Sequence, residues 1–335
     1  MLEPRSEFRE RLRRMTRGTK VIFHGLKRSP LSFLGLIMIG FFVVVAVAAP
    51  ILAPPEPGQD PYVAPHEEIS YYVFPLPTFP SPEHHFGTLN GYDLYYGCIW
   101  GTRTAFQVAL LAIVIQLVVG LSIGSIAGYF GGVIDELMMR LTDIFFAFPG
   151  LLVALIFIVA LPAEWVVNLG PLNLSVTFSP MQKIAVAIAL TGWPLYARLI
   201  RGEIIKVKSE DYVEAAKAIG CSNIRIVTRH ILPNTTYPVL IMASLNIGTI
   251  VLSAATLSFL GFGPGGRYSP ELRCYAEWGT IISDTRRFLF WSTTEPFKYI
   301  HTLLFPGLFL SCFVLGWSLI GDALRNVLDP MLRRR

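Results

Sequence analysis

Charged residues are scarce in this chain. Only 15% of its 335 residues are Asp, Glu, Lys or Arg, against roughly a quarter in soluble domains. By contrast, 53% of the residues are hydrophobic and the mean hydropathy is +0.53. This composition excludes an ordinary soluble protein and indicates a chain that lies in lipid.

Three sequence patterns that are typical of ligand binding are also missing. No Gly-Lys pair occurs, which excludes the phosphate-binding loop G-x-x-x-x-G-K-[ST], so the chain is not expected to bind ATP itself. No basic stretch is interleaved with aromatic residues that could stack on bases, which argues against nucleic acid as a partner. The adjacent His84 and His85 have no third ligand beside them, so we expect no metal site.

Six apolar runs are long enough, or nearly so, to cross the hydrocarbon core of a bilayer as helices, which takes about 20 residues each. We expect spans at Leu31–Ala53, Ala105–Gly128, Ile144–Pro162, Ile184–Ile200, Tyr237–Phe262 and Tyr299–Gly321. The first run is too long for the apolar part of a signal peptide and follows an Arg-rich segment, so we interpret it as a retained anchor.

Few polar side chains fall inside these runs. They are Gln107, Gln116, Asn246 and His301, while Asp143, Lys183, Arg198 and Asp322 are expected at or near helix ends. Ion-coupled carriers hold ionisable residues within the bilayer, and intramembrane enzymes need paired catalytic groups there. The pattern therefore argues against a secondary carrier or channel. It also argues against an enzyme, and we assign no catalytic residue.

The distribution of Lys and Arg predicts the orientation of the spans. Six spans put both termini on one side, and the segments on that side hold 21 of the 28 Lys and Arg residues, in 1–29, 129–142, 198–235 and 322–335. Because positively charged loops stay inside, both termini are predicted to be cytoplasmic. Cys98 and Cys274 then fall outside, where they could form a disulfide or remain ordinary buried thiols.

The predicted spans divide the chain into five parts. These are a basic cytoplasmic segment at 1–29, a first transmembrane helix at 30–53, an outer loop rich in Pro and aromatics at 54–104, a core of five spans at 105–323, and a cytoplasmic tail at 324–335. The core contains an inner loop at 201–235 and an outer loop at 263–298.

A glycine face marks the second span. Gly120, Gly124 and Gly128 follow one another at intervals of four residues, which places them on one side of a helix. Such a face lets another helix backbone approach closely, so it predicts a packing seam. A moving gate is the alternative interpretation.

The inner loop carries strong signals for a short helix. Ser209 is a candidate N-cap, and Glu210 and Asp211 suit the positive end of the helix dipole. Lys217 suits the negative end, and Gly220 can adopt the left-handed conformation that stops a helix.

A second short helix is predicted to begin at Ser222 and to end before Pro233, which prevents continuation. The two helices would form a compact helix-turn-helix that a partner's groove could hold. An ordinary amphipathic connector is the alternative.

The residues of this loop resemble a known motif. Glu214-Ala215-Ala216, then Gly220, then Leu232-Pro233 are similar to the EAA loop of the permease subunits of bacterial and archaeal ABC importers. His230 occupies the Ile position of the motif, as is common in the peptide-permease branch. The resemblance implies a segment that couples to a separate ATPase through Glu214, Ala215, Ala216, Lys217, Gly220, His230, Leu232 and Pro233.

A second block resembles the C-type subunit of dipeptide and oligopeptide permeases. It precedes the second span and consists of His85, Phe86, Gly87, Thr88, Asp93, Gly101, Thr102 and Arg103. The family usually has Asp and Arg where this chain has Leu89 and Tyr92, so the outer face departs from the family pattern there.

The resemblance implies an all-α membrane protein with six transmembrane helices and the type I importer permease fold. It also implies a heterodimer with a homologous B-type permease, two ATPase subunits that bind ATP and Mg, and an extracytoplasmic solute-binding protein. This chain would carry no cofactor and would form half of an alternating-access pathway across the cell membrane of a prokaryote. Di- and oligopeptides are the expected solutes, with nickel or oligosaccharides as alternatives.

Overall fold

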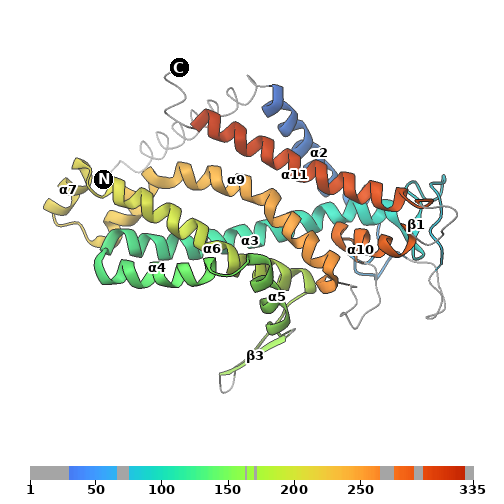
Figure 1. Ribbon diagram of the computed structural model, residues 1–335, viewed down its shortest axis with the longest axis horizontal. Helices are drawn as coiled ribbons and strands as arrows, with labels where there is room; N and C mark the ends of the chain where they lie inside the picture. Colours follow the sequence, from blue (N-terminus) through green and yellow to red (C-terminus); the bar gives the residue numbers. More distant parts are fainter. Residues whose placement is uncertain are drawn as a thin grey trace, which may run out of the picture.

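The computed structural model describes residues 30–65, 75–162, 164–169, 172–264, 275–289 and 297–328. Over these residues the chain is mainly a bundle of long helices that run side by side (Figure 1). Five helical segments are long and apolar enough to cross a membrane. They are α2 (Pro30–Leu52), α3 (Leu94–Phe130), α6 (Pro180–Val207), the segment Tyr237–Phe262 that includes most of α9 (Leu232–Leu257), and α11 (His301–Leu328).

The third predicted span requires a correction. The run Ile144–Pro162 is not one helix, because α4 (Gly132–Phe146) and α5 (Gly150–Ala160) meet there at an angle of 92°. Pro149 lies at the break with non-helical backbone, at φ −58° and ψ 121°, and a proline disfavours helical backbone at the residue before it. Six spans are reached only if α4 and α5 together count as one broken span.

The observed helix bounds also correct the expected position of one charge. α6 continues to Val207, so Arg198 lies well inside that helix rather than at its end. Asp143 does lie near a helix end, in the last turn of α4. Hydropathy marks the apolar part of a helix and not its ends, which is why Arg198 was expected at a helix end.

The second span is longer than the apolar run predicts. α3 begins at Leu94 rather than Ala105, within the stretch expected as outer loop, because Asp93 caps it by accepting the N–H of Tyr96 at 2.9 Å. Its 37 residues make it about 55 Å long, whereas the hydrocarbon core is about 30 Å thick. α3 therefore extends well beyond the membrane.

The most extensive helix contact among the described residues lies between α3 and α6, along the glycine face. A Cβ atom at Gly120 would lie 2.6 Å from the Cβ of Tyr196, and one at Gly124 would lie 2.3 Å from the carbonyl oxygen of Ala197. A Cβ at Gly128 would lie 3.1 Å from the backbone of α6. Side chains on these residues would leave no room, so the two backbones meet directly.

Two pairs of short strands accompany the helices. β1 (Thr88–Leu89) and β2 (Tyr92–Asp93) form an antiparallel hairpin before α3. β3 (Glu164–Leu169) and β4 (Leu172–Thr177) form a second antiparallel pair after α5, which projects sideways from the bundle (Figure 1).

The bundle has two distinct ends (Figure 1). The β1–β2 hairpin and α10 (Trp278–Leu289) lie at one, the β1 end, and α7 (Asp211–Ala218) projects from the other, the α7 end. Trp278 of α10 packs on Phe42 of α2 and Phe313 of α11, with ring centroids 6.0 and 5.7 Å from that of Trp278. Aromatic packing therefore fixes α10 against two of the long helices.

The glycine seam predicts the effect of one added methyl group. Gly124→Ala should lower the free energy of unfolding by about 1–3 kcal/mol, because the seam has no space for a side chain. The change is measured as a fall in melting temperature of the purified chain in detergent. Gly40→Ala is the matched control, because a Cβ at Gly40 meets nothing within 4 Å; equal melting of the two variants would contradict the seam.

Candidate functional site

The α7 end carries the segment that the sequence singles out. α7 is followed by the short α8 (Asn223–Arg225) and the π-helix η1 (Ile226–Ile231), which leads into α9. Gly220 stops α7 with φ +80°, its N–H donates to the carbonyl of Lys217 at 2.9 Å, and the N–H of Cys221 donates to that of Ala216 at 3.1 Å. This is the Schellman arrangement that a left-handed glycine permits.

The predicted start of the first short helix requires a correction. Ser209 is not the N-cap, because its hydroxyl donates backwards to the carbonyl of Lys206 at 3.1 Å. Glu210 is the N-cap of α7, without a side-chain hydrogen bond.

The predicted stop at Pro233 is also wrong. The chain continues as helix from Asn223 into α9, because the N–H of Leu232 reaches back five residues to the carbonyl of Val227. The wider π turn changes the hydrogen-bond register just before the proline, and the side chain of Asn234 donates to the carbonyl of His230 at 2.6 Å. The helix therefore continues through Pro233, with a local change in its hydrogen-bond register.

The two sides of α7 differ sharply in exposure. Val213 and Ala216 are buried and belong to the same apolar cluster as Ile226 and Ile231 of η1. Exposed residues of α7 are Glu214, Ala215 and Lys217, and Gly220 just after the helix is exposed too. Of the remaining predicted coupling residues, His230 and Leu232 are half-buried and Pro233 is exposed.

Two isoleucines extend the exposed side of this segment. Ile219 is 81% exposed and Ile224 is 78% exposed, on either side of the Gly220 turn. Large apolar side chains grouped on a projecting tip are typical of an interaction surface. No sequence motif pointed to either residue.

The segment is tied to the ends of two long helices. The Tyr129 hydroxyl at the end of α3 donates to the Asn223 side chain of α8 at 2.8 Å. Lys208, just after α6, donates to the carbonyl of Tyr129. Neither bond was predicted, and together they join α8 to the α3–α6 pair.

A cavity of about 210 Å³ lies between α3, α5, α6 and α9. Its polar lining includes Gln116 and Asn246, two of the four polar residues expected inside spans. Three hydroxyl side chains also line it, namely Thr191, Thr249 and Ser253.

The amide side chains in the cavity bond to one another and to their surroundings. Asn246 donates to the side-chain oxygen of Gln116 at 3.0 Å and to the Tyr196 hydroxyl at 3.1 Å, and Gln116 donates to the carbonyl of Ile188 at 3.2 Å. Gly192 makes this possible, because a Cβ there would lie 2.1 Å from the Gln116 nitrogen. The cavity can therefore offer uncharged donors and acceptors to a solute.

The other two predicted intramembrane polar residues lie elsewhere. His301 begins α11 at the β1 end, and its Nε2 lies 2.9 Å from the carbonyl oxygen of Thr78. Gln107 hydrogen bonds to the Tyr62 hydroxyl.

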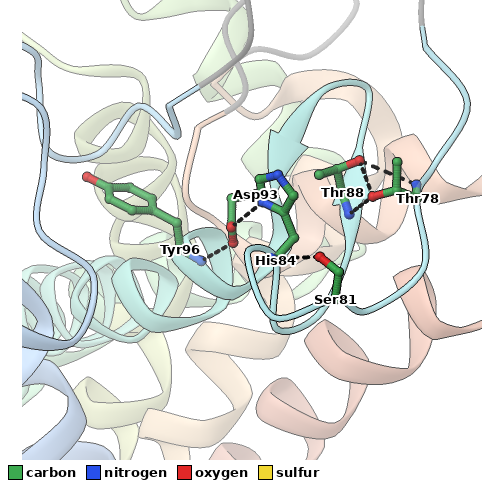
Figure 2. A network of polar contacts seen from close by, with 6 residues as sticks. All are labelled: Thr78, Ser81, His84, Thr88, Asp93 and Tyr96. Carbon is green, nitrogen blue, oxygen red and sulfur yellow. Dashed lines mark hydrogen bonds and ion pairs between the residues drawn. The ribbon is translucent and has the colours of Figure 1, made fainter.

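Figure 2 shows a polar network at the β1 end that joins two residues of the predicted outer block, Thr88 and Asp93, to Thr78, Ser81, His84 and Tyr96. Asp93 caps α3 and also accepts from His84, whose Nδ1 lies 2.9 Å away. The hydroxyls of Thr88 and Thr78 lie 2.8 Å apart. Gly87 has φ +79°, and a Cβ on it would lie 2.2 Å from the Thr78 carbonyl oxygen, so these residues hold the loop against the start of α3.

Packing interactions hold the remaining residues of the outer block. The Phe86 ring stacks on that of Phe305 at 4.1 Å, and the Arg103 guanidinium lies 5.0 Å from the centre of the Trp100 ring. A Cβ on Gly101 would lie 2.6 Å from the Trp278 indole nitrogen.

His85 and Thr102 complete this block. The His85 ring lies 5.3 Å from that of Tyr95, and the buried Thr102 hydroxyl donates to the carbonyl of Cys98. Leu89 is buried beside Leu94, which gives an apolar position where the family usually has Asp. The block is therefore a structural junction between the loop, α3 and α10.

Neither a metal site nor a disulfide is found in the part of the chain that the structure describes. No group of three or more His, Cys, Asp and Glu side chains is arranged there for a metal ion. Cys98 is buried as a free thiol, and its possible partner Cys274 lies outside the described residues.

Two carboxyls on or beside α10 are buried. The Glu277 carboxylate accepts from the backbone N–H groups of Gly279 and Thr280 at 2.9 and 2.7 Å, yet burial raises its pKa. Burial raises the pKa of Asp284 to about 6, against the opposing effect of the nearby Arg287 and Arg286.

Comparison with known proteins identifies the family of this chain. Residues 120–334 match the family described as binding-protein-dependent transport system inner membrane component. The chain belongs to this family. Residues 19–67 of the permease also match the N-terminal transmembrane domain of oligopeptide transport permease C. The permease is a multi-pass inner membrane protein with the type I importer fold, and it is a transport subunit rather than an enzyme.

Several curated relatives resemble the permease over nearly its whole length. A dipeptide transport system permease of Alkalihalophilus pseudofirmus is 36% identical over 312 residues, covering 93% of this chain and 89% of that protein. A glutathione transport system permease of Pectobacterium atrosepticum is 30% identical, covering 88% and 86%. An oligopeptide transport system permease of Bacillus subtilis is 30% identical, covering 92% and 88%.

The raised pKa of Asp284 predicts a pH dependence of stability. Because the folded state holds this proton more tightly than the unfolded chain, the free energy of unfolding should rise as the pH falls from about 7 to about 5, by up to about 1 kcal/mol. Asp284→Asn should remove this rise, measured as melting temperature against pH in detergent. Asp211→Asn, at an exposed position, is the control, and an unchanged slope in Asp284→Asn would contradict the prediction.

Proposed function

We propose that this permease forms half of the pathway of an ATP-driven importer of di- and oligopeptides. The proposal of a peptide cargo rests on the dipeptide, glutathione and oligopeptide permeases that the chain resembles along its length. The cavity supports it chemically, because amide and hydroxyl side chains can pair with the N–H and C=O groups of a peptide backbone.

The observation that carries the ATP-driven mechanism is the two-sided α7 segment. Its buried side holds it to η1 through Val213 and Ala216, while Glu214, Ala215 and Ile219 remain exposed on a tip that projects beyond the bundle. A rigid knob of this kind suits a groove on a partner. The partner in this proposal is an ATPase subunit, which binds the ATP and Mg that this chain has no phosphate-binding loop to hold.

The α7 end is cytoplasmic in this proposal, because the basic loop 201–235 lies there, and both termini are then cytoplasmic too. The complete importer contains a homologous B-type permease, two ATPase subunits and an extracytoplasmic binding protein at the β1 end. Closure of the ATPases draws the two knobs together, and the bonds from Tyr129 to Asn223 and from Lys208 to Tyr129 pass that movement to α3 and α6. The cavity then opens in turn to each side.

Ala215 and Ala216 provide a sharp test of the coupling role. Ala215→Trp should reduce the ATPase activity and transport of the assembled complex about tenfold or more, because an exposed bulky ring keeps the partner surface from closing on α7. Its melting temperature should stay near that of wild type. Ala216→Trp should instead lower the melting temperature, because Ala216 is 4% exposed and has no room for an indole.

Val47→Trp controls for adding an indole to the chain, since Val47 is 74% exposed on α2, far from α7. The measurements are ATP hydrolysis and solute uptake by the complex in proteoliposomes. Normal coupling in Ala215→Trp, with normal melting, would show that α7 does not dock on an ATPase.

Co-purification tests the assembly and the cargo together. The tagged permease, extracted in mild detergent from its native host, should bring down a sister permease, ATPase chains and a binding protein that carries peptide, all identified by mass spectrometry. A binding protein that carries nickel or an oligosaccharide would refute the peptide cargo. A permease that purifies alone as a homo-oligomer would refute the importer assembly.

A further inference from the structure

An ion pair joins α6 to α4. Arg198 of α6 donates a hydrogen bond from its guanidinium to the carboxylate of Asp143 of α4. Arg198 lies nine residues before the end of α6 at Val207, which is about 14 Å along the helix. Asp143 lies about 17 Å from the start of α4 at Gly132, in the last turn of α4 before its break with α5. Both charges are therefore set back from the α7 end, where α6 ends and α4 begins.

This ion pair is only half covered by its own chain. The side chains of Arg198 and Asp143 are 48% and 53% exposed. Charged side chains at membrane depth face water or protein rather than hydrocarbon. The pair therefore faces the solute pathway or a neighbouring subunit.

The next ion pair along the same helices is built differently. Arg201 binds Asp135 through two hydrogen bonds of 2.5 and 2.6 Å, and the two side chains are 34% and 17% exposed. This bidentate, more covered pair fixes α4 against α6 and leaves little of the carboxylate for another ligand. It provides an internal comparison for the exposed pair.

The exposed pair continues the lining of the cavity. Thr191, Leu195 and Phe146 line the cavity, and Arg198 follows Leu195 by one helical turn. The Arg198 guanidinium lies 4.1 Å from the centre of the Phe146 ring. A solute that leaves the cavity toward the α7 end therefore meets the charged pair next.

The pair retains binding capacity. Among the described residues, the Arg198 side chain makes its one hydrogen bond to Asp143, whereas a guanidinium has five N–H donors and a carboxylate accepts at two oxygens. A molecule with one carboxylate and one ammonium group can bind there by forming two ion pairs where there had been one. The ends of an unmodified peptide at neutral pH carry these two groups.

We propose that Arg198 and Asp143 form a binding station for the two charged termini of a peptide, on the cytoplasmic side of the cavity. Arg198 takes the carboxylate terminus and Asp143 takes the ammonium terminus, while the cavity amides pair with the backbone between or beyond them. The inference rests on the proposed import of peptides and adds the residues that recognise unblocked ends. It predicts that this subunit itself favours zwitterionic peptides.

Direct binding to the complex without its binding protein tests the station. The permease–ATPase complex is reconstituted in nanodiscs without ATP, and four probes are titrated: the dipeptide Ala-Phe, its N-acetyl form, its amide form and the doubly blocked form. The wild type should bind the free dipeptide about tenfold more tightly than the doubly blocked form. Arg198→Gln should weaken the free and N-acetyl forms about five- to tenfold and leave the amide form unchanged.

Asp143→Asn should show the complementary pattern. It should weaken binding of the free and amide forms and leave the N-acetyl form unchanged, because that form has no ammonium group to lose. Arg198→Lys keeps the charge and should retain most of the preference, which supplies a readout should the neutral variant fail to assemble. Arg201→Gln at the covered pair is the control, and it should lower the melting temperature without changing the ratio between probes.

Two results would overturn the inference. If Arg198→Gln and Asp143→Asn weaken all four probes equally, or change only the melting temperature, the pair is a structural contact and not a binding station. If the wild type binds free and blocked dipeptides alike while the complex still imports peptides, the station fails and the proposed function stands. A wild-type complex that neither binds nor imports any of the probes would remove the peptide cargo and the station together.

Discussion

The direct contact between the backbones of α3 and α6 is the constraint on which the rest of this permease depends. Gly120 and Gly124 leave no side chain between the helices, so the two axes are held at a small separation over several turns. The same principle operates one turn further along, where Gly192 of α6 makes room for the Gln116 side chain of α3. Because of that glycine, the seam ends in a polar cavity rather than in a continuous apolar contact.

The seam also sets what can move together. Tyr129 directly follows Gly128 at the end of the glycine face, and it bonds through its hydroxyl to Asn223 and through its carbonyl to Lys208. In the proposed mechanism, a displacement of the α7–α8 segment therefore acts on the α3–α6 pair as one body. Tight packing transmits such a displacement, because there are no loose side chains to absorb it.

Much of this architecture could be predicted from the sequence, because the signals are local. The apolar runs place the long helices, the spacing of the glycines places the seam, and Gly220 places the end of α7, since each depends on residues that are neighbours in the chain. The family model then confirms the class of protein to which the EAA-like loop pointed. The roles of individual residues in that loop remain proposals.

The rest could not be predicted, because it depends on where helices begin, bend and meet. Hydropathy joined Ile144 to Pro162 as one span, since both sides of the break at Pro149 are apolar. Pro233 gave a stop signal that a π turn overrides with help from the Asn234 side chain. The partners of Gln116 lie more than 70 residues away along the chain, so no local pattern could reveal the polar cavity.

A transport pathway has to release what it binds, and the chemistry of this one is arranged for weak binding. The cavity amides already satisfy one another, so a solute exchanges existing hydrogen bonds for new ones, and each such exchange contributes only about 1 kcal/mol. The exposed pair of Arg198 and Asp143 is likewise bonded before any solute arrives, and half-exposed ion pairs contribute modestly because water screens them. Strong capture of the solute therefore does not reside in these groups. In the proposed importer, affinity comes from a separate binding protein and direction is supplied through α7, which is how a chain with so few intramembrane charges can serve as a solute pathway.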